Sequence, residues 1–208
     1  ARAAWLAGAE EDALAALKQV EAGGAEVRCQ RAWVLYDLEQ LARSEAALAE
    51  LLASSPDFAP AHALRALQLA QRSRGSEAAA ALERARELGL KGADEARAHA
   101  WLGYFARLHK LPERPARADV LARFGRLREL EPDDARARAL VISYEAAARG
   151  GWQHCLAELN QLVEEAPALG VAWSFACNAL RESLLPAAKQ GQPDVFRPLM
   201  DRALAGLQ

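Results

Sequence analysis

Apolar residues recur along most of the chain at the spacing of an amphipathic α-helix, and short polar or glycine-containing segments separate the periodic stretches. From Ala59 to about Gly89 two such stretches are divided near residues 72–76, where Ser and Gly favour a tight turn. The pattern predicts a pair of antiparallel helices. The alternation typical of strands is missing, so we expect an all-helical protein of about ten to twelve helices.

Similar stretches lie on both sides of this pair. Helices are expected over 10–21, 26–39 and 45–54, the last with Leu48 and Leu51 inward, although residues 26–54 follow a poorer register. The next pair contains Trp101, Leu102, Gly103 and Phe124, and its turn at 109–115 is about five residues longer than that of a regular unit. A further unit runs from Ala135 through a turn at 149–151 to Cys155, Leu159 and Leu162. Two last helices are expected over 171–185 and 194–207.

The segment 56–89 resembles the tetratricopeptide repeat, a unit of two helices with a period of roughly 34 residues. Small residues stand where that family packs its helices closely, and larger apolar residues stand in the gaps: Ala66, Ala78 and Ala85, then Leu69 and Leu82. His62 replaces the commonest aromatic, and Arg65 replaces a Leu. Over 25–185 the resemblance implies a right-handed α-solenoid of about five repeats. Residues 1–24 and 186–208 would add terminal helices to this single domain of 1–208.

The resemblance also implies a concave groove lined by the first helix of each repeat. The positions that would face this groove are Leu67, Ala70, Gln71, Arg97, Tyr104, Arg107, Arg136, Ser143, Asn178, Arg181 and Glu182. A protein or peptide partner is therefore expected on the concave face. Ala63, Leu64 and Leu67 stand where some family members use Lys and Asn to hold a terminal carboxylate, so that clamp is not expected. The long turn at 109–117 is an alternative place for a partner.

Charge and hydropathy exclude other classes of partner. The net charge is -2, with 26 basic and 28 acidic residues mixed along the chain, so no basic face favours nucleic acid. This argues against a pentatricopeptide-like RNA reader, whose hairpins have a similar period. No apolar run approaches the roughly 20 residues that cross a bilayer, and we expect no membrane insertion.

Candidate catalytic or metal-binding residues do not form a recognisable motif. His62, His99, His109 and His154 are not in HExxH spacing, and Cys29, Cys155 and Cys177 form no CxxC pair. His154 and Cys155 are neighbours, but successive helical residues point about 100° apart. Acidic runs at 10–12 and 129–134 are expected to be solvated helix starts. We therefore expect no catalytic residue, no metal and no cofactor.

The aromatic residues divide into two groups. Trp101 and Trp173 are expected to fill space between hairpins, because large aromatic residues at helical spacing are usually core. Trp33 and Tyr36 lie three residues apart on one helix face. Because the register around them is poorer, these two are expected to be exposed.

These observations favour a scaffold or adaptor that binds a protein or peptide, and not an enzyme. The alternative is a recognition arm of a larger enzyme, which the absence of an initiator Met permits. The 22 Arg against 4 Lys, together with abundant Ala, are typical of a GC-rich bacterial genome. Because the cysteines form no disulfide framework, a cytoplasmic location is expected, or a periplasmic one if a signal peptide was removed.

Overall fold

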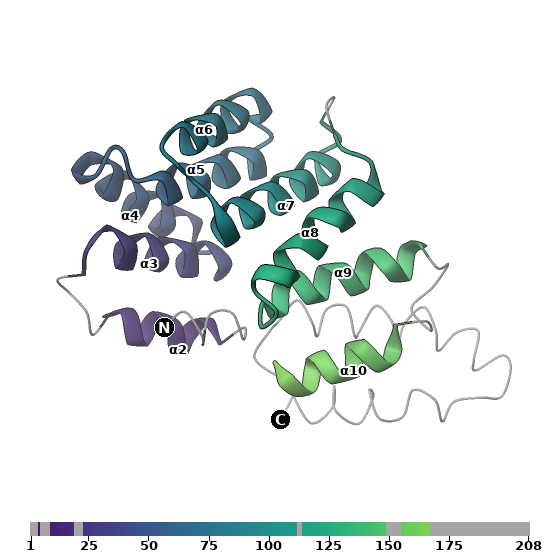
Figure 1. Cartoon of the computed structure of the whole chain (residues 1–208). Coiled ribbons are helices and arrows are strands. Elements are labelled where there is room, and N and C mark those ends of the chain that lie inside the picture. Colours follow the sequence, from purple (N-terminus) through teal and green to yellow (C-terminus); the bar gives the residue numbers. More distant parts are fainter. Residues whose placement is uncertain (1–3, 5–8, 19–22, 112–113, 149–154, 167–208) are drawn as a thin grey trace, which may run out of the picture. The chain divides into compact units, whose positions relative to one another are not determined.

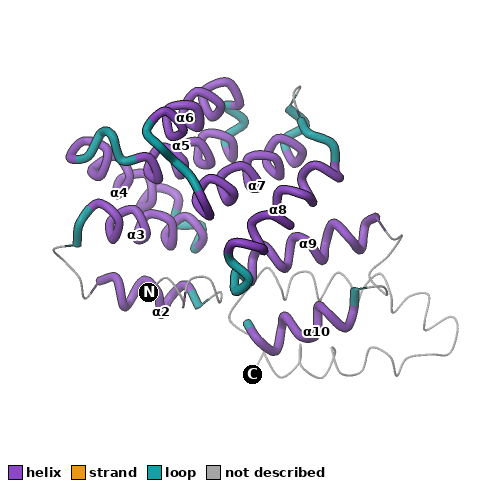
Figure 2. Tube along the Cα trace, in the orientation of Figure 1, coloured by secondary structure: helices purple, strands orange, loops and turns teal. Residues whose placement is uncertain are grey.

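The computed structural model describes residues 4, 9–18, 23–111, 114–148 and 155–166 (Figure 1). All regular elements in these ranges are helices, with loops between them (Figure 2). They are α2 (Glu10–Lys18), α3 (Ala25–Asp37), α4 (Leu41–Ser54), α5 (Ala59–Gln71), α6 (Gly75–Glu87), α7 (Gly92–Leu108), α8 (Arg117–Leu130), α9 (Ala135–Ala148) and α10 (Leu156–Glu165). The all-helical prediction is confirmed for these residues. The helices expected over 171–185 and 194–207 lie outside them.

The chain divides after Pro132 into two compact units, the first containing α2 to α8 and the second α9 and α10. In the first unit α3 packs on α4, α5 on α6 and α7 on α8, which gives three successive hairpins. Contacts of α5 with both α3 and α7 place the first helices of these hairpins side by side. In the second unit α9 packs on α10.

The first two hairpins repeat each other in length and register. The first helices begin at Ala25 and Ala59, and the second helices begin at Leu41 and Gly75, so both pairs of helices are separated by the same offset. This offset matches the period of roughly 34 residues that is typical of tetratricopeptide hairpins. Both α3 and α5 have 13 residues. The register over α3 and α4 is therefore regular, contrary to the expectation from sequence, because equivalent helices keep the spacing of one repeat.

The same backbone feature ends the first helix of each hairpin in the first unit. Glu39, Ser73 and Lys110 have φ angles of 58°, 61° and 54°, in the left-handed region. The next residue in each case donates its backbone N–H to a carbonyl five residues back: Gln40 to Leu35 at 2.9 Å, Arg74 to Leu69 at 2.9 Å and Leu111 to Ala106 at 2.8 Å. This bond ends a helix in the Schellman motif. The three turns thus start alike, although none of the left-handed residues is glycine.

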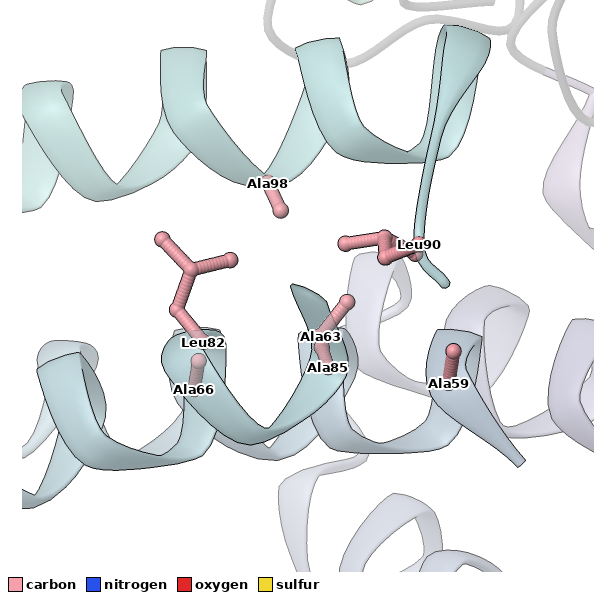
Figure 3. Close-up of a cluster of buried hydrophobic side chains, with 7 residues drawn as sticks. All are labelled: Ala59, Ala63, Ala66, Leu82, Ala85, Leu90 and Ala98. Carbon is pink, nitrogen blue, oxygen red and sulfur yellow. The ribbon is translucent and has the colours of Figure 1, made fainter. Parts of the chain in front are cut away.

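Small side chains form the contact between α5, α6 and α7 (Figure 3). The buried cluster consists of Ala59, Ala63, Ala66, Leu82, Ala85, Leu90 and Ala98. Leu82 and Leu90 lie between α7, which carries Ala98, and the alanines of α5 and α6. Ala78 and Ala85 are 2% and 0% exposed, whereas Ala80 on the same helix is exposed. Both predicted positions on α6 are therefore buried, and Ala85 belongs to the cluster between the helices.

A buried hydroxyl connects the first hairpin to the second. Ser44 of α4 is fully buried and donates its hydroxyl to the carbonyl oxygen of Ala32 at 2.7 Å. Gln68 of α5 donates its Nε2 to the same hydroxyl oxygen at 3.0 Å. Three helices are therefore joined by two hydrogen bonds away from water, where an unmade bond would be costly.

The aromatic residues of α3 are not exposed as expected. Trp33 and Tyr36 are 7% and 9% exposed, and their rings meet edge to face with centroids 6.2 Å apart. The residues that stand one repeat later on α5, Leu67 and Ala70, are also buried. This face of the first helices is therefore interior in both hairpins, which explains why the exposure prediction is wrong.

Trp101 packs inside its own hairpin. Its ring meets that of Phe124 on α8 edge to face, with centroids 5.6 Å apart, and it is only half-buried. Trp101 was expected to fill space between hairpins, but this contact lies within one hairpin. Trp173 lies outside the described residues.

Candidate functional site

The residues expected to line a groove are mostly interior. Leu67, Arg97 and Arg136 are 1%, 2% and 9% exposed. Gln71, Tyr104, Arg107 and Ser143 are half-buried, and Asn178 and Arg181 lie outside the described residues. Packing between helices thus covers Leu67, Arg97 and Arg136, whereas the half-buried members are partly open to solvent. That the whole set lines one groove stays a prediction.

Arg97 is buried in the hairpin of α7 and α8, and two acidic residues compensate its charge. Its Nη2 donates to Oε2 of Glu131, just beyond α8, and its Nη1 lies 3.8 Å from Oδ1 of Asp94. Glu131 is 8% exposed. Arg97 thus makes an ion pair inside the third hairpin, a role that burial permits only with close partners.

The acidic run 129–134 is therefore not a solvated helix start throughout. Asp134 is 3% exposed and accepts a bond from the N–H of Ala137 at 2.9 Å on its Oδ1. It begins α9 as expected for an acid at a helix N-terminus, but the site is buried. The prediction is right about the helix start and wrong about solvation.

Burial also shifts the pKa values of Arg136 and Tyr104, two further members of the predicted set. Desolvation lowers the pKa of Arg136 to about 10, and it raises the pKa of Tyr104 above its usual value. The Tyr104 ring contacts those of Trp101 and Phe105 at centroid distances of 5.7 and 5.4 Å. These contacts and pKa shifts show that both side chains are packed against other parts of the protein.

Arg107 holds the connection between α7 and α8 in place. Its Nη1 donates to the carbonyl oxygen of Pro115 at 2.8 Å. The connection spans residues 109–116, whereas those of the two preceding hairpins span only 38–40 and 72–74. The predicted lengthening of this turn is confirmed, and Arg107 stabilises its second half.

A cleft of about 790 Å³ lies beside this connection, between α6 and the α7–α8 hairpin. Its α6 wall includes Ala78, Ala79 and Leu82, and its α7 wall includes Leu102 and Ala106. The connection adds Leu111 and Pro115, and the end near the α5–α6 turn carries the hydroxyls of Ser73 and Ser76. The lining is mainly apolar, as is usual for sites that bind ligands or peptide segments.

Two glycines allow the walls of the cleft to approach closely. A Cβ added to Gly75 would lie 3.0 Å from Cδ1 of Leu111, and one added to Gly103 would lie 3.1 Å from Nη1 of Arg123. Leu111 therefore rests on the start of α6, and α8 packs tightly on α7. The long connection and these small residues are the sequence signals that could have indicated the cleft.

Two charged side chains, Asp119 and Arg123, both on α8, belong to the lining. Asp119 is exposed and its Oδ2 accepts a bond from the N–H of Ala116 at 3.0 Å, which caps the helix. Arg123 is half-buried and donates its Nη1 to the carbonyl oxygen of His99 at 3.3 Å. Among the described residues no carboxylate pairs with the Arg123 guanidinium.

The histidines in the described ranges have structural contacts. His62 makes a bond of 2.7 Å with the carbonyl oxygen of Pro56, and His109 stacks on Phe105 with centroids 6.2 Å apart. His99 bonds the guanidinium of Arg86, and its pKa is lowered, first by burial and then by the charges of Arg86 and Arg123. His154 lies outside the described residues, so the expectation that it forms no catalytic pair with Cys155 stays a prediction.

One group in the second unit has the residue types of a metal site. Potential donor atoms of Glu145, Cys155 and Glu158 all lie within 4.8 Å of one another. Cys155 is buried, whereas Glu158 is exposed. Zinc accepts both thiolates and carboxylates, but this set is not one of the Cys and His combinations of structural zinc sites, and the expectation that the chain holds no metal stays a prediction.

No described helix is both long and apolar enough to cross a bilayer. Comparisons of the chain with protein-family models, with curated proteins and with solved structures gave no match.

Proposed function

We propose that this chain is a non-catalytic binding module of the tetratricopeptide type, and that it holds a segment of a partner protein in the cleft between α6 and the α7–α8 hairpin. The observation that carries the proposal is the cleft itself, with about 790 Å³ of space and a mainly apolar lining. A site of this size and composition can bury most of the surface of a group the size of a drug molecule, which is comparable to a few side chains of a bound segment.

The arrangement of helices supports the repeat assignment. The equal offset between the helices of the first two hairpins and the three matching left-handed turns are expected for stacked copies of one unit. In such an array, insertions between helices lie in loops on one face, which is often the binding face. Here the insertion is the longer connection 109–116, which borders the cleft.

The charge of the site favours a protein segment over RNA. Its two charged lining residues are Asp119 and Arg123, which have opposite signs, whereas a groove for a nucleic-acid strand would carry several cations. A free adaptor and a recognition arm of a larger enzyme could use this cleft in the same way.

The test places a large side chain in the cleft and, as a control, the same side chain at a neighbouring position outside it. Ala79 and Ala80 are neighbouring exposed residues of α6, but only Ala79 lines the cleft. A peptide is first selected on the wild-type chain from a library of short random sequences. Ala79→Trp should then weaken its binding by roughly tenfold or more, and Ala80→Trp should leave it unchanged.

The competing location is the half-buried pair Tyr104 and Arg107. If Tyr104→Ala abolishes binding of the selected peptide and Ala79→Trp does not, the partner lies on the inner wall and the cleft proposal is wrong. Fluorescence anisotropy of the labelled peptide measures all three variants on one scale.

A further inference from the structure

Among the described residues, the guanidinium of Arg123 in the cleft has no carboxylate partner. An acid four residues before an arginine on a helix is within reach of it and can pair with it, and Asp119 stands at that position. Instead, the Asp119 carboxylate accepts the backbone N–H of Ala116. The local partner of Arg123 is thus committed to capping α8, and the guanidinium reaches the carbonyl oxygen of His99, at 3.3 Å.

Two exposed arginines, Arg126 and Arg84, do have carboxylate partners. Arg126, one turn further along α8, pairs with Glu129 at 2.6 Å, and Arg84 on α6 pairs with Glu87 at 3.2 Å and Asp57 at 3.0 Å. These side chains are solvated and screened, so their pairs contribute little. Arg123 is half-buried beside apolar walls, where a charge interacts more strongly than in open water.

The chemistry that completes this site is a carboxylate carried by an apolar segment. A guanidinium offers several N–H donors in a planar fork that matches both oxygens of a carboxylate. The walls of Ala79, Leu82 and Leu102 accept apolar side chains on either side of that carboxylate. A bound segment of this kind satisfies the cation and covers the apolar lining together.

On the basis of the proposed function, we infer that the partner segment carries an acidic side chain between apolar residues, and that Arg123 binds its carboxylate. Arg123 is then the specificity-determining residue of the cleft. The lining also contains the carboxylate of Asp119, but that group already accepts the N–H of Ala116, so the preference for an acid comes from the guanidinium of Arg123 and not from a net positive charge of the cleft.

The experiment is a double-mutant cycle on a synthetic peptide selected on the wild-type chain. Selected peptides should contain Asp or Glu flanked by apolar residues. Changing that acid to its amide should weaken binding roughly tenfold, and Arg123→Met should do the same, while the two changes together should cost little more than either alone. Arg126→Met is the matched control and should bind like wild type.

The outcomes separate the two proposals. If Ala79→Trp leaves binding intact, the cleft is not the site and the proposed function fails. If Ala79→Trp weakens binding but the acid-to-amide change does not, only the role of Arg123 is overturned. Loss of binding on amidation of the peptide C-terminus, with the acid-to-amide change silent, would assign the carboxylate to a chain end and also overturn the inference.

A structural effect of Arg123→Met is tested separately. Arg123→Lys retains the charge and should recover part of the affinity, whereas a residue that only packs would not depend on charge. Unchanged thermal unfolding of Arg123→Met shows that the fold is intact. If Arg123→Lys binds as poorly as Arg123→Met and both unfold at lower temperature than wild type, Arg123 only supports the structure and the inference is wrong.

Discussion

Replacing Ala85 by Leu tests the close contact between α5, α6 and α7. Ala85 is fully buried, and its neighbours in the cluster are largely alanines: Ala59, Ala63, Ala66 and Ala98. Leu adds three carbon atoms at a point where these alanines have only a methyl group to move aside, and the other two members of the cluster, Leu82 and Leu90, already fill the space toward α7. The backbones of two helices must therefore separate to admit the new side chain.

The expected loss follows from this rigidity. Overpacking a buried site typically costs about 1 to 3 kcal/mol, and a site walled by alanines on neighbouring helices belongs in the upper part of that range, at about 2 to 3 kcal/mol. For a chain of this length each kcal/mol lowers Tm by roughly 2 to 4 °C. A fall of roughly 4 to 12 °C is therefore expected.

Two further variants on α6 provide the comparison. Ala80→Leu places the same atoms in solvent and should change stability by no more than about 0.5 kcal/mol. Ala78 is 2% exposed but borders the cleft, so free space can accept part of the added side chain. Ala78→Leu should therefore cost less than Ala85→Leu, by about 1 kcal/mol or more.

Urea unfolding followed by circular dichroism at a helix band measures all three variants. An equal m-value across them would show that the midpoint shifts report stability and not a change of the unfolded state. If Ala85→Leu and Ala80→Leu unfold at the same urea concentration, Ala85 is not at a close helix contact and the packing argument is refuted.

Three other changes test separate features. Arg97→Met should lower the free energy of unfolding by about 3 to 5 kcal/mol, because Glu131 is left buried without its cation; the double variant Arg97→Met, Glu131→Leu should regain much of this loss in urea titrations, and strict additivity would contradict the pairing. Because the pKa of His99 is lowered in the folded chain, the unfolded chain takes up this proton first, so stability should be full above about pH 6.5 and fall as the pH drops below it. His99→Gln should flatten this fall in a pH series of thermal unfolding, and an unchanged slope would exclude His99 as its source. Because Glu39 has a φ of 58°, Glu39→Gly should raise the free energy of unfolding by about 0.5 to 1 kcal/mol, whereas Glu39→Ala should not raise it. Equal urea midpoints for the two variants would show that backbone strain at this position does not affect stability.

The helical hairpins could be predicted from sequence because their signals are local. Ala78 and Ala85 are seven residues apart on one helix, and the turn at 72–76 contains its own breaking residues. The longer connection 109–116 was visible as an interruption of the period. In each case the residues that decide the structure lie within a few helical turns of one another, where periodicity is informative.

The burial of Arg97 could not be predicted in the same way. Its partner Glu131 lies beyond the end of the next helix, and periodicity along one helix does not reveal a pair made across a hairpin. A family pattern places Arg97 on a face that usually meets solvent. Only the packed structure shows that the charge is neutralised inside.

The candidate site was predicted only in part. The turn at 109–117 was considered as an alternative site, and the cleft does border it. Its apolar walls, however, come from α6 and α7, and small residues such as Ala79 and Ala106 look the same in sequence whether they face a neighbour or a space. A cleft depends on how far two hairpins stand apart, which no single residue encodes.

The hydroxyl of Ser44 has a consequence for the order in which hairpins assemble. Surfaces made of Ala and Leu fit one another in many combinations, so hairpins of equal length could stack in a wrong sequence or exchange between chains. In such an arrangement Gln68 would be buried without its acceptor, at about 1 to 3 kcal/mol, whereas Ser44 would keep its bond to the carbonyl oxygen of Ala32. Ala78, which stands at the equivalent position of the next hairpin, has no hydroxyl. An artificial array made of copies of α3 and α4, with Gln at the position of Gln68, should therefore stack its hairpins in one order. An array made of copies of α5 and α6 would lack the hydroxyl that distinguishes the correct neighbour from a wrong one.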